Sequence, residues 1–284
     1  MRLLVTGAAG MLGQDLLRAA EAAGHDTVGL ARDDVDITDA AGVQAAMREA
    51  GPDVVINCAG WTDVDGAEAS PRETRAANAA GAGNVAAAAA LTGAWMVQIS
   101  TDYVFDGAKR SPYVESDPPA PLSVYGASKL DGEREVADRA PDRHTIVRTS
   151  WLFGSRGRCF PATILRLAAE RDELTVVEDQ IGCPTFTGHL ANALMELVDA
   201  RTLPLGIVHM AAGGSCSWYE LAREVLASAG VICDLRPGDT ADLPRPARRP
   251  AYSVLASEWG AIVPRLPDWR EGVAEYMSAG MPAA

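Results

Sequence analysis

Short apolar runs alternate with stretches of helical periodicity along the first 150 residues of the chain. The apolar runs have the length and flanking residues of buried strands and cover residues 2–6, 26–30, 53–57, 94–99 and 144–148. The helical stretches between them cover residues 14–23, 36–50, 72–91 and 124–140. Strands that alternate with helices favour a parallel sheet covered on both faces. We therefore predict an α/β fold with a Rossmann-like, doubly wound parallel sheet over residues 1–150.

The pattern becomes less regular beyond residue 150. Helical stretches are expected at 163–170, 189–199 and 218–229, and strand-like segments at 174–177 and 206–210. No charged or flexible linker separates the two halves, so we expect them to move as one body with a cleft. The sequence thus predicts a smaller C-terminal lobe over residues 151–284, some segments of which rejoin the main sheet.

Three glycines, Gly7, Gly10 and Gly13, follow the first predicted strand and precede the first predicted helix. Glycines at this spacing let the backbone turn tightly and approach a pyrophosphate, which then lies at the positive end of the helix. A structural turn is the alternative, but the position between a strand and a helix favours a dinucleotide site. Residues 1–150 are therefore predicted to be an NAD(P)-binding domain.

Arg32 follows the second predicted strand, where dinucleotide folds meet the adenosine ribose. An arginine can pair with the 2′-phosphate of NADP, whereas NAD-specific sites commonly have a carboxylate there. The alternatives are that Arg32 pairs with Asp33 or Asp34, or that one of these acids holds the ribose. The sequence favours NADPH as the cofactor and leaves NADH open.

The third and fourth predicted strands end in residues that suit a ligand at the same edge of the sheet. Cys58, Ala59 and Gly60 are small and let a cofactor lie against the backbone. Thr101 follows the fourth strand, and its hydroxyl can bind a substrate oxygen. We therefore expect Thr101 to be a catalytic residue, with capping of the strand as the alternative.

Tyr125 and Lys129 lie four residues apart in a helix that Ser123 can cap and Pro141 ends. An ammonium close to a phenol favours the phenolate, so we expect Lys129 to draw the pKa of Tyr125 toward neutral and to let it transfer a proton. A chance spacing on a solvated helix is the alternative. Lysine otherwise occurs only at position 109 in this arginine-rich chain, which favours a function for Lys129.

Charge and composition exclude several classes of function. The net charge of −13 argues against nucleic acid or an anionic membrane as a partner. The five cysteines are odd in number and form no C-x-x-C motif, and the four histidines have no ligand spacing, so we predict no metal site. The N-terminus resembles no signal peptide and no apolar run is long enough to span a membrane, so a cytoplasmic protein is expected.

Three motifs together resemble the extended short-chain dehydrogenase/reductases and, within them, the dTDP-4-dehydrorhamnose reductase family. These are the glycine turn at 7–13, the sequence S-T-D-Y-V-F-D-G at 100–107 and Y-G-A-S-K at 125–129. The segments at 148–151, 179–185 and 245–250 are also similar to that family, so the resemblance covers nearly the whole chain. It implies that NADPH or NADH reduces the C4 ketone of a dTDP-6-deoxy-hexulose to give dTDP-L-rhamnose.

The resemblance also implies roles for individual residues. Tyr125 would protonate the new alkoxide, Lys129 would hold the ribose and tune Tyr125, and Thr101 would bind the ketone oxygen. Asp102 and Trp151 match positions that face the sugar nucleotide, which makes the smaller C-terminal lobe a substrate-binding lobe. For Trp151 the alternative is a place in the core, because an aromatic residue after a strand is usually buried there. Positions around the dinucleotide are matched by Gly10, Met11, Leu12, Asp36, Ile37, Ala59, Gly60 and Trp61.

Departures from related families sharpen the hypothesis. The similar 4,6-dehydratases have a glutamate after Thr-Asp, whereas this chain has Tyr103, which favours simple reduction. Some members of the reductase family are dimers with a magnesium ion held by carboxylates. This chain has Asp15 and His189 at the matching places, and a histidine there does not favour Mg²⁺. A monomer and a homodimer both remain open.

Two further questions stay open at the level of sequence. Arg245, Arg248 and Arg249 can meet a substrate diphosphate or form an ordinary solvated loop. The scaffold can also serve a non-catalytic, NADP-binding regulatory subunit like the one that regulates methionine adenosyltransferase, or a reductase of another dTDP-4-keto-6-deoxy sugar. Retention of Thr101, Tyr125 and Lys129 favours catalysis.

Overall fold

The central sheet is built of six parallel strands in the order β10-β5-β4-β3-β1-β2. The computed structural model describes residues 1–200 and 203–279, so the last five residues of the expected lobe lie outside it. The strands are β1 (Arg2–Thr6), β2 (Asp26–Leu30), β3 (Val54–Asn57), β4 (Trp95–Thr101), β5 (His144–Thr149) and β10 (Gly206–His209). Each strand falls on an apolar run of the sequence, and the predicted Rossmann-like sheet is confirmed.

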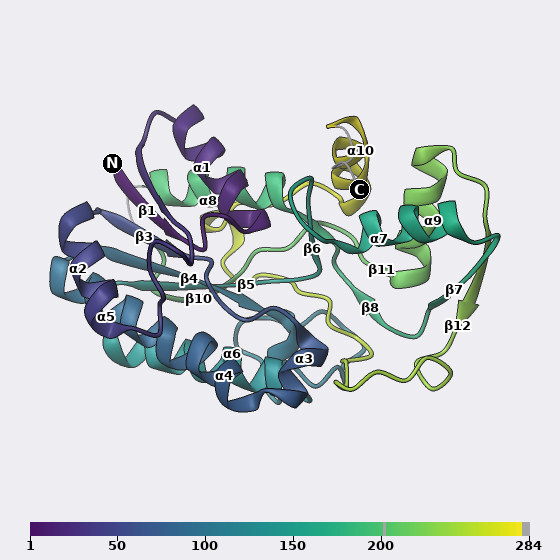
Figure 1. Ribbon diagram of the computed structural model, residues 1–284, viewed down its shortest axis with the longest axis horizontal. Helices are drawn as coiled ribbons and strands as arrows, with labels where there is room; N and C mark the ends of the chain where they lie inside the picture. Colours follow the sequence, from purple (N-terminus) through teal and green to yellow (C-terminus); the bar gives the residue numbers. More distant parts are fainter. Residues whose placement is uncertain (201–202, 280–284) are drawn as a thin grey trace.

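Helices cover both faces of the sheet because successive side chains of each strand point to opposite faces (Figure 1). Leu3 and Val5 pack against α1 (Met11–Ala22) and α8 (Thr187–Asp199). Leu4 packs on the other face, in a core with α2 (Ala40–Ala50), α5 (Ala82–Thr92) and α6 (Val124–Arg139). This two-sided burial explains why the strands are apolar at nearly every position.

The strand order reverses between β1 and β3. From β1 the chain crosses to β2 on one side, and from β3 onward the strands are added on the other side. Ligands of open α/β sheets bind outside the carboxyl ends of the strands at such a switch point. The glycine turn after β1 and the small residues after β3 flank it.

One predicted helix differs from the structure. The stretch at 72–91 forms α4 (Pro71–Arg75), a π-helical segment η1 (Ala76–Gly81) and α5. Asn78 in η1 is buried and donates to Trp61 O (3.1 Å) and to the Ser128 hydroxyl (2.9 Å). A π-helical turn in this position brings the Asn78 side chain to its partners, which helical periodicity cannot predict. Before it, α3 (Val64–Ala69) begins at the N-cap Asp63 and was not predicted.

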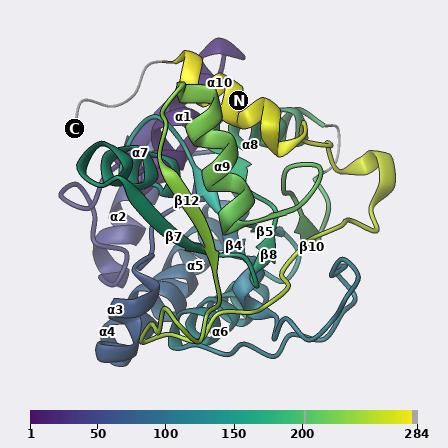
Figure 2. The ribbon, with the colours of Figure 1, turned by 90° about the vertical axis from the view of Figure 1, so that its right-hand side faces the viewer.

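Much of the second half of the chain packs together as a lobe beside the carboxyl end of the sheet (Figure 1 and Figure 2), whereas α8 and β10 rejoin the main sheet and its helical layer. The helices of the lobe are α7 (Phe160–Glu170), α9 (Trp218–Ala229) and α10 (Trp269–Ser278). Short strand pairs complete it: β7 (Glu173–Val177) with β12 (Asp234–Gly238), β8 (Ile181–Gly182) with β11 (Cys216–Ser217), and β6 (Leu152–Phe153) with β9 (Thr185–Phe186). A separate apolar core that includes Leu221, Trp269 and Tyr276 stabilises the lobe.

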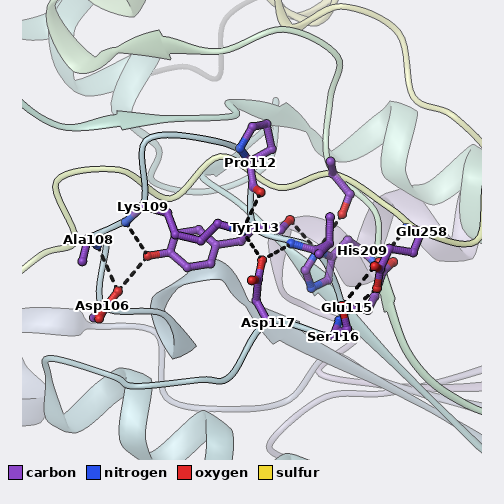
Figure 3. Close-up of polar contacts among 12 residues, drawn as sticks. Asp106, Ala108, Lys109, Pro112, Tyr113, Glu115, Ser116, Asp117, His209 and Glu258 are labelled. Atoms are coloured by element: carbon purple, nitrogen blue, oxygen red, sulfur yellow. Dashed lines mark hydrogen bonds and ion pairs between the residues drawn. The ribbon is translucent and has the colours of Figure 1, made fainter.

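The segment after β12 returns to the main sheet and is fixed there (Figure 3). Tyr113 N donates to Val254 O (2.7 Å) and Ala256 N donates to Tyr113 O (2.8 Å). Glu115 accepts from His209 N in β10 (2.8 Å) and from Glu258 N (2.7 Å). These contacts hold residues 252–258 against the edge strand of the sheet. Within the described residues, no helix is both long and apolar enough to cross a membrane.

Candidate active site

A cavity of about 1700 Å³ lies at the carboxyl ends of β1, β3, β4 and β5. It extends from the switch point of the sheet to the inner face of the lobe. Every residue that the sequence analysis placed at the cofactor, the catalytic group or the sugar lines it: Gly7, Gly10, Met11, Leu12, Gly13, Arg32, Asp36, Ile37, Ala59, Gly60, Trp61, Thr101, Asp102, Tyr125, Lys129 and Trp151. The structure thus brings the whole predicted set together in one place.

The glycine turn has the close backbone packing that a dinucleotide diphosphate requires. Gly7 has φ 68°, and a Cβ atom there would lie 2.6 Å from the backbone nitrogen of Ala59. A Cβ atom at Gly13 would lie 2.4 Å from the carbonyl oxygen of Gly7. Helix α1 begins after Gly10 without a side-chain cap, so its first N–H groups are available to an anion. These features fit the expected cofactor.

Arg32 lines the cavity beyond β2, and the acids around it serve the local turn. The carboxylate of Asp36 accepts hydrogen bonds from the backbone nitrogen of Thr38 (2.9 Å) and from its hydroxyl (2.8 Å), which hold the pKa of Asp36 below its usual range. The carboxylate of Asp34 accepts from Ala31 N (2.8 Å). Arg32 therefore lines the cavity, while the carboxylates of Asp34 and Asp36 accept hydrogen bonds from nearby backbone nitrogens.

Helix α6 places Tyr125 and Lys129 one turn apart on the face that meets β4. Ser123 caps this helix by accepting a hydrogen bond from Gly126 N (3.1 Å). The ammonium of Lys129 is buried and donates to Ile99 O in β4 (2.7 Å). Burial lowers the pKa of Lys129 to about 8. The helix and the strand are thus joined at the point where the catalytic residues lie.

The expected lowering of the Tyr125 pKa is wrong. Burial raises it to about 12, and a hydrogen bond with the Thr101 hydroxyl offsets this only in part. The physical reason is that Lys129 directs its ammonium at the Ile99 carbonyl, while burial disfavours the charged form of the phenol. At neutral pH the phenol therefore carries its proton, which is the form that a proton donor needs.

Asp102 follows Thr101 in the 3-10 turn η2 (Asp102–Val104) and is almost fully buried. One carboxylate oxygen accepts from the hydroxyls of Ser253 (2.5 Å) and Ser150 (3.1 Å), and the other accepts from Thr101 (3.0 Å). Burial raises the pKa of Asp102 to about 6, against the effect of these hydrogen bonds. Both oxygens are thus engaged by hydroxyl groups of the protein, although the residue lines the cavity.

Trp151, the residue after β5 and Ser150, has a left-handed backbone with φ 47°. Its indole stacks on that of Trp218, with 3.6 Å between centroids and 5° between planes. Phe160 at the start of α7 packs against Trp218 at the start of α9, with ring centroids 4.6 Å apart. All three rings line the cavity. Sequence reasoning missed Phe160 and Trp218 in this role because no periodicity links them to Trp151.

The arginines after β12 divide into two groups. Arg245 and Arg249 line the cavity and both pair with the carboxylate of Asp65 in α3, at 2.6 Å and 3.0 Å. These pairs hold the pKa of Asp65 well below its usual range. Arg248 is exposed and is not among the lining residues. Asp65 was not anticipated, because α3 itself was not predicted.

The positions compared with a magnesium site are engaged by other side chains. Asp15 is buried and its carboxylate accepts from the Thr187 hydroxyl (2.5 Å) and pairs with Arg18. His189 Nε2 lies 2.9 Å from a carboxylate oxygen of Glu275 in α10. In the part of the chain that the structure describes, no three histidine, cysteine or acidic side chains are grouped as metal ligands.

Comparison with known proteins agrees with this site. A sequence model described as the RmlD substrate binding domain matches residues 1–281. The dTDP-4-dehydrorhamnose reductase of Streptomyces griseus is 43% identical over 284 residues, which cover 98% of this chain and 93% of that protein. The dTDP-4-keto-6-deoxy-D-glucose reductase of Streptomyces niveus is 40% identical over 258 residues, or 90% of this chain and 89% of that protein.

A solved structure extends the agreement to the fold. The crystal structure of dTDP-4-dehydrorhamnose reductase from Bacillus anthracis str. Ames in complex with NADP superposes with a TM-score of 0.94 at 37% identity, covering 98% of this chain and 99% of that one. The motifs, the sheet and the cavity therefore lead to the same conclusion: this chain belongs to the dTDP-4-dehydrorhamnose reductase family.

Proposed function

We propose that the protein reduces the C4 ketone of dTDP-4-dehydro-L-rhamnose to the alcohol of dTDP-L-rhamnose with NADPH, or with NADH. The observation that carries the proposal is that Tyr125, Lys129 and Thr101 line the same cavity as the glycine turn. When bound, the nicotinamide supplies a hydride to C4. Tyr125 donates its proton to the oxygen that gains charge, Thr101 binds that oxygen, and Lys129 holds the ribose.

The two halves of the chain divide the ligands between them. Residues 1–150 bind the dinucleotide: the glycine turn and the N-terminus of α1 hold its diphosphate, and Arg32 pairs with the 2′-phosphate of NADPH. The lobe within residues 151–284 binds the dTDP sugar, with Trp151 against it and Asp102 at the edge of its site. The raised pKa of Tyr125 supports its role, because a phenol that stays protonated is a competent acid.

Simple reduction fits the site better than dehydration. A 4,6-dehydratase needs a base after Thr101 and Asp102, and Tyr103 occupies that position. Tyr103 is buried, and burial raises its pKa, so it cannot remove a proton from a sugar near neutral pH.

We also propose that the enzyme acts in the cytoplasm as a monomer or a homodimer.

The test is oxidation of NADPH by the purified protein, followed by absorbance, with dTDP-4-dehydro-L-rhamnose as the substrate. We expect turnover that falls by about 10³-fold in a Tyr125→Phe variant, since general acid catalysis contributes about 10² to 10⁴. The variant should still bind NADPH. Turnover that survives the substitution would show that Tyr125 is not the proton donor.

A second candidate is the reduction of another dTDP-4-keto-6-deoxy sugar. The relative from Streptomyces niveus, at 40% identity, supports it, because its name refers to dTDP-4-keto-6-deoxy-D-glucose. A panel of such sugars in the same assay separates the two, since the preferred substrate is the one with the highest kcat/KM. NADPH binding without turnover of any ketosugar would instead favour a non-catalytic regulatory subunit.

A further inference from the structure

The hydroxyl of Thr101 gives its only proton to Asp102. The distance from Thr101 Oγ1 to Asp102 Oδ1 is 3.0 Å, and the threonine oxygen accepts from the backbone nitrogen of Tyr103 (3.2 Å). The Tyr125 side chain lines the same cavity as Thr101. A hydroxyl has one hydrogen to donate. While this proton is directed at Asp102, Thr101 therefore cannot donate a hydrogen bond to a ketone oxygen.

The protonation state of Asp102 determines which acceptor the Thr101 hydroxyl donates to. An ionised carboxylate only accepts hydrogen bonds, whereas the neutral acid has one O–H to donate. The hydroxyls of Ser150 and Ser253 both donate to Oδ2, so the proton of a neutral Asp102 belongs on Oδ1, which faces Thr101. Neutral Asp102 then donates to Thr101 Oγ1 and frees the threonine proton for another acceptor.

We propose that Asp102 is a positioning residue whose protonation decides whether Thr101 donates to the ketone oxygen beside Tyr125. The inference rests on the proposed reduction. With Asp102 neutral, both Thr101 and Tyr125 donate to the ketone oxygen as charge develops on it. With Asp102 ionised, Thr101 remains turned toward the carboxylate and Tyr125 donates alone. The proton of Asp102 stays on Asp102 throughout, and Tyr125 supplies the one that the product keeps.

The titratable side chains that face Asp102 do not ionise in the pH range in which Asp102 does. The titratable groups that face it are Tyr125 from α6, Tyr103 in its own turn and Cys183 between β8 and β9. Burial raises the pKa of each of the three, so all of them are neutral near pH 7. Burial raises the pKa of Asp102 itself to about 6, so both of its forms are populated in the range where such an enzyme works.

The partners of Asp102 are held in place by backbone contacts. Ser253 N donates to Ile181 O (2.8 Å), and the carbonyl oxygen of its neighbour Val254 accepts from Tyr113 N (2.7 Å). The Ser150 hydroxyl accepts from Cys183 N (3.4 Å). Because these donors are fixed on Oδ2, a change of protonation is met by rotation of the Thr101 hydroxyl.

The test is the pH dependence of kcat/KM for the ketosugar between about pH 5 and pH 9. In the wild type we expect a fall of about 100-fold through the ionisation of Asp102, the cost of one lost donor to the oxyanion. Asp102→Asn should remove this limb, because its amide oxygen accepts from the serines and its nitrogen always donates to Thr101. Ser253→Ala should move the limb up by about one pH unit, since it removes a donor to the ionised form.

Ser257→Ala is the matched control, because Ser257 lies on the same segment but donates to Glu115. Its profile should equal that of the wild type. Infrared titration of the carboxylic acid band in the ligand-free protein should show the same shift in Ser253→Ala and loss of the band in Asp102→Asn. A limb near pH 6 that persists in Asp102→Asn, or that Ser253→Ala leaves in place, would overturn the inference, whereas the ionisation of Lys129 gives a separate limb near pH 8 in every variant. Absence of turnover in the wild type at every pH would instead overturn the proposed reduction.

Discussion

The ammonium of Lys129 donates a hydrogen bond to the backbone carbonyl of Ile99, with 2.7 Å between Nζ and O. This contact joins α6 to β4 at the edge of the cavity. Burial lowers the pKa of Lys129 to about 8, and the nearby carboxylate of Glu133 opposes the effect. Lys129 is therefore an ammonium at neutral pH but loses its charge at a lower pH than an exposed lysine would.

The first prediction concerns the pH dependence of NADPH binding. As the pH rises through about 8, Lys129 loses its proton and one of the donors that we assign to the ribose. The affinity for NADPH, measured by fluorescence titration, should therefore fall between about pH 7 and pH 9. A Lys129→Met variant should bind more weakly at pH 7 and lose this dependence. Lys109→Met is the control, because Lys109 pairs with Asp117 instead, and it should behave as the wild type.

The second prediction concerns the choice between NADPH and NADH. If Arg32 pairs with the 2′-phosphate, Arg32→Ala should raise the Kd for NADPH by about tenfold to a hundredfold, as expected for a charged hydrogen bond. The Kd for NADH should change by about twofold or less. Arg48→Ala, in the last turn of α2, removes an equal charge at an exposed position and should change neither. An equal loss of both cofactors in Arg32→Ala would contradict the phosphate role.

The features that the sequence predicts correctly depend on local patterns. The buried strands are apolar on both faces, and Leu3 and Leu4 on neighbouring positions enter two different cores. Tyr125 and Lys129 share a helix, so a spacing of four residues places them on one face. Thr101 reaches the same edge because parallel strands end together. Each of these inferences needs only a period, or the rule that one edge collects the ends of the strands.

The features that were missed depend on contacts between distant segments. Asp65 pairs with Arg249, and Trp151 stacks on Trp218, without any pattern in the sequence that links the partners. The pKa of Tyr125 was wrongly expected to fall because the sequence shows the neighbouring charge but not the burial, and burial is the larger effect. Such contacts, and the burial that shifts a pKa, depend on three-dimensional packing, which sequence periodicity does not show.

The third prediction concerns a buried ion pair between α6 and β5. Arg148 bonds to both carboxylate oxygens of Glu133, at 2.9 Å from Nε and 2.7 Å from Nη2, and both residues are almost fully buried. Glu133→Gln would leave the Arg148 charge without its partner in the interior. The free energy of unfolding, measured in urea, should fall by about 3 to 5 kcal/mol.

The matched control for this pair lies on the surface. Glu170 pairs with Arg166 on α7, and about half of each side chain is exposed. Glu170→Gln should leave the urea midpoint almost unchanged, because water screens an exposed pair. If both substitutions had equal effects, the buried pair would be no more important for stability than the exposed one.

The fourth prediction separates sugar binding from cofactor binding. A Cβ atom at Gly182 would lie 2.4 Å from Cε2 of Trp151, so Gly182→Ala must displace the indole from Trp218. If Trp151 contacts the sugar nucleotide, KM for the dTDP sugar should rise by about tenfold or more, while the Kd for NADPH stays the same. Trp fluorescence should change as the stack is lost. At Gly213 the nearest atom to an added Cβ is 3.6 Å away, so Gly213→Ala should alter none of these values. A rise in KM without a change in fluorescence would place the effect elsewhere than at Trp151.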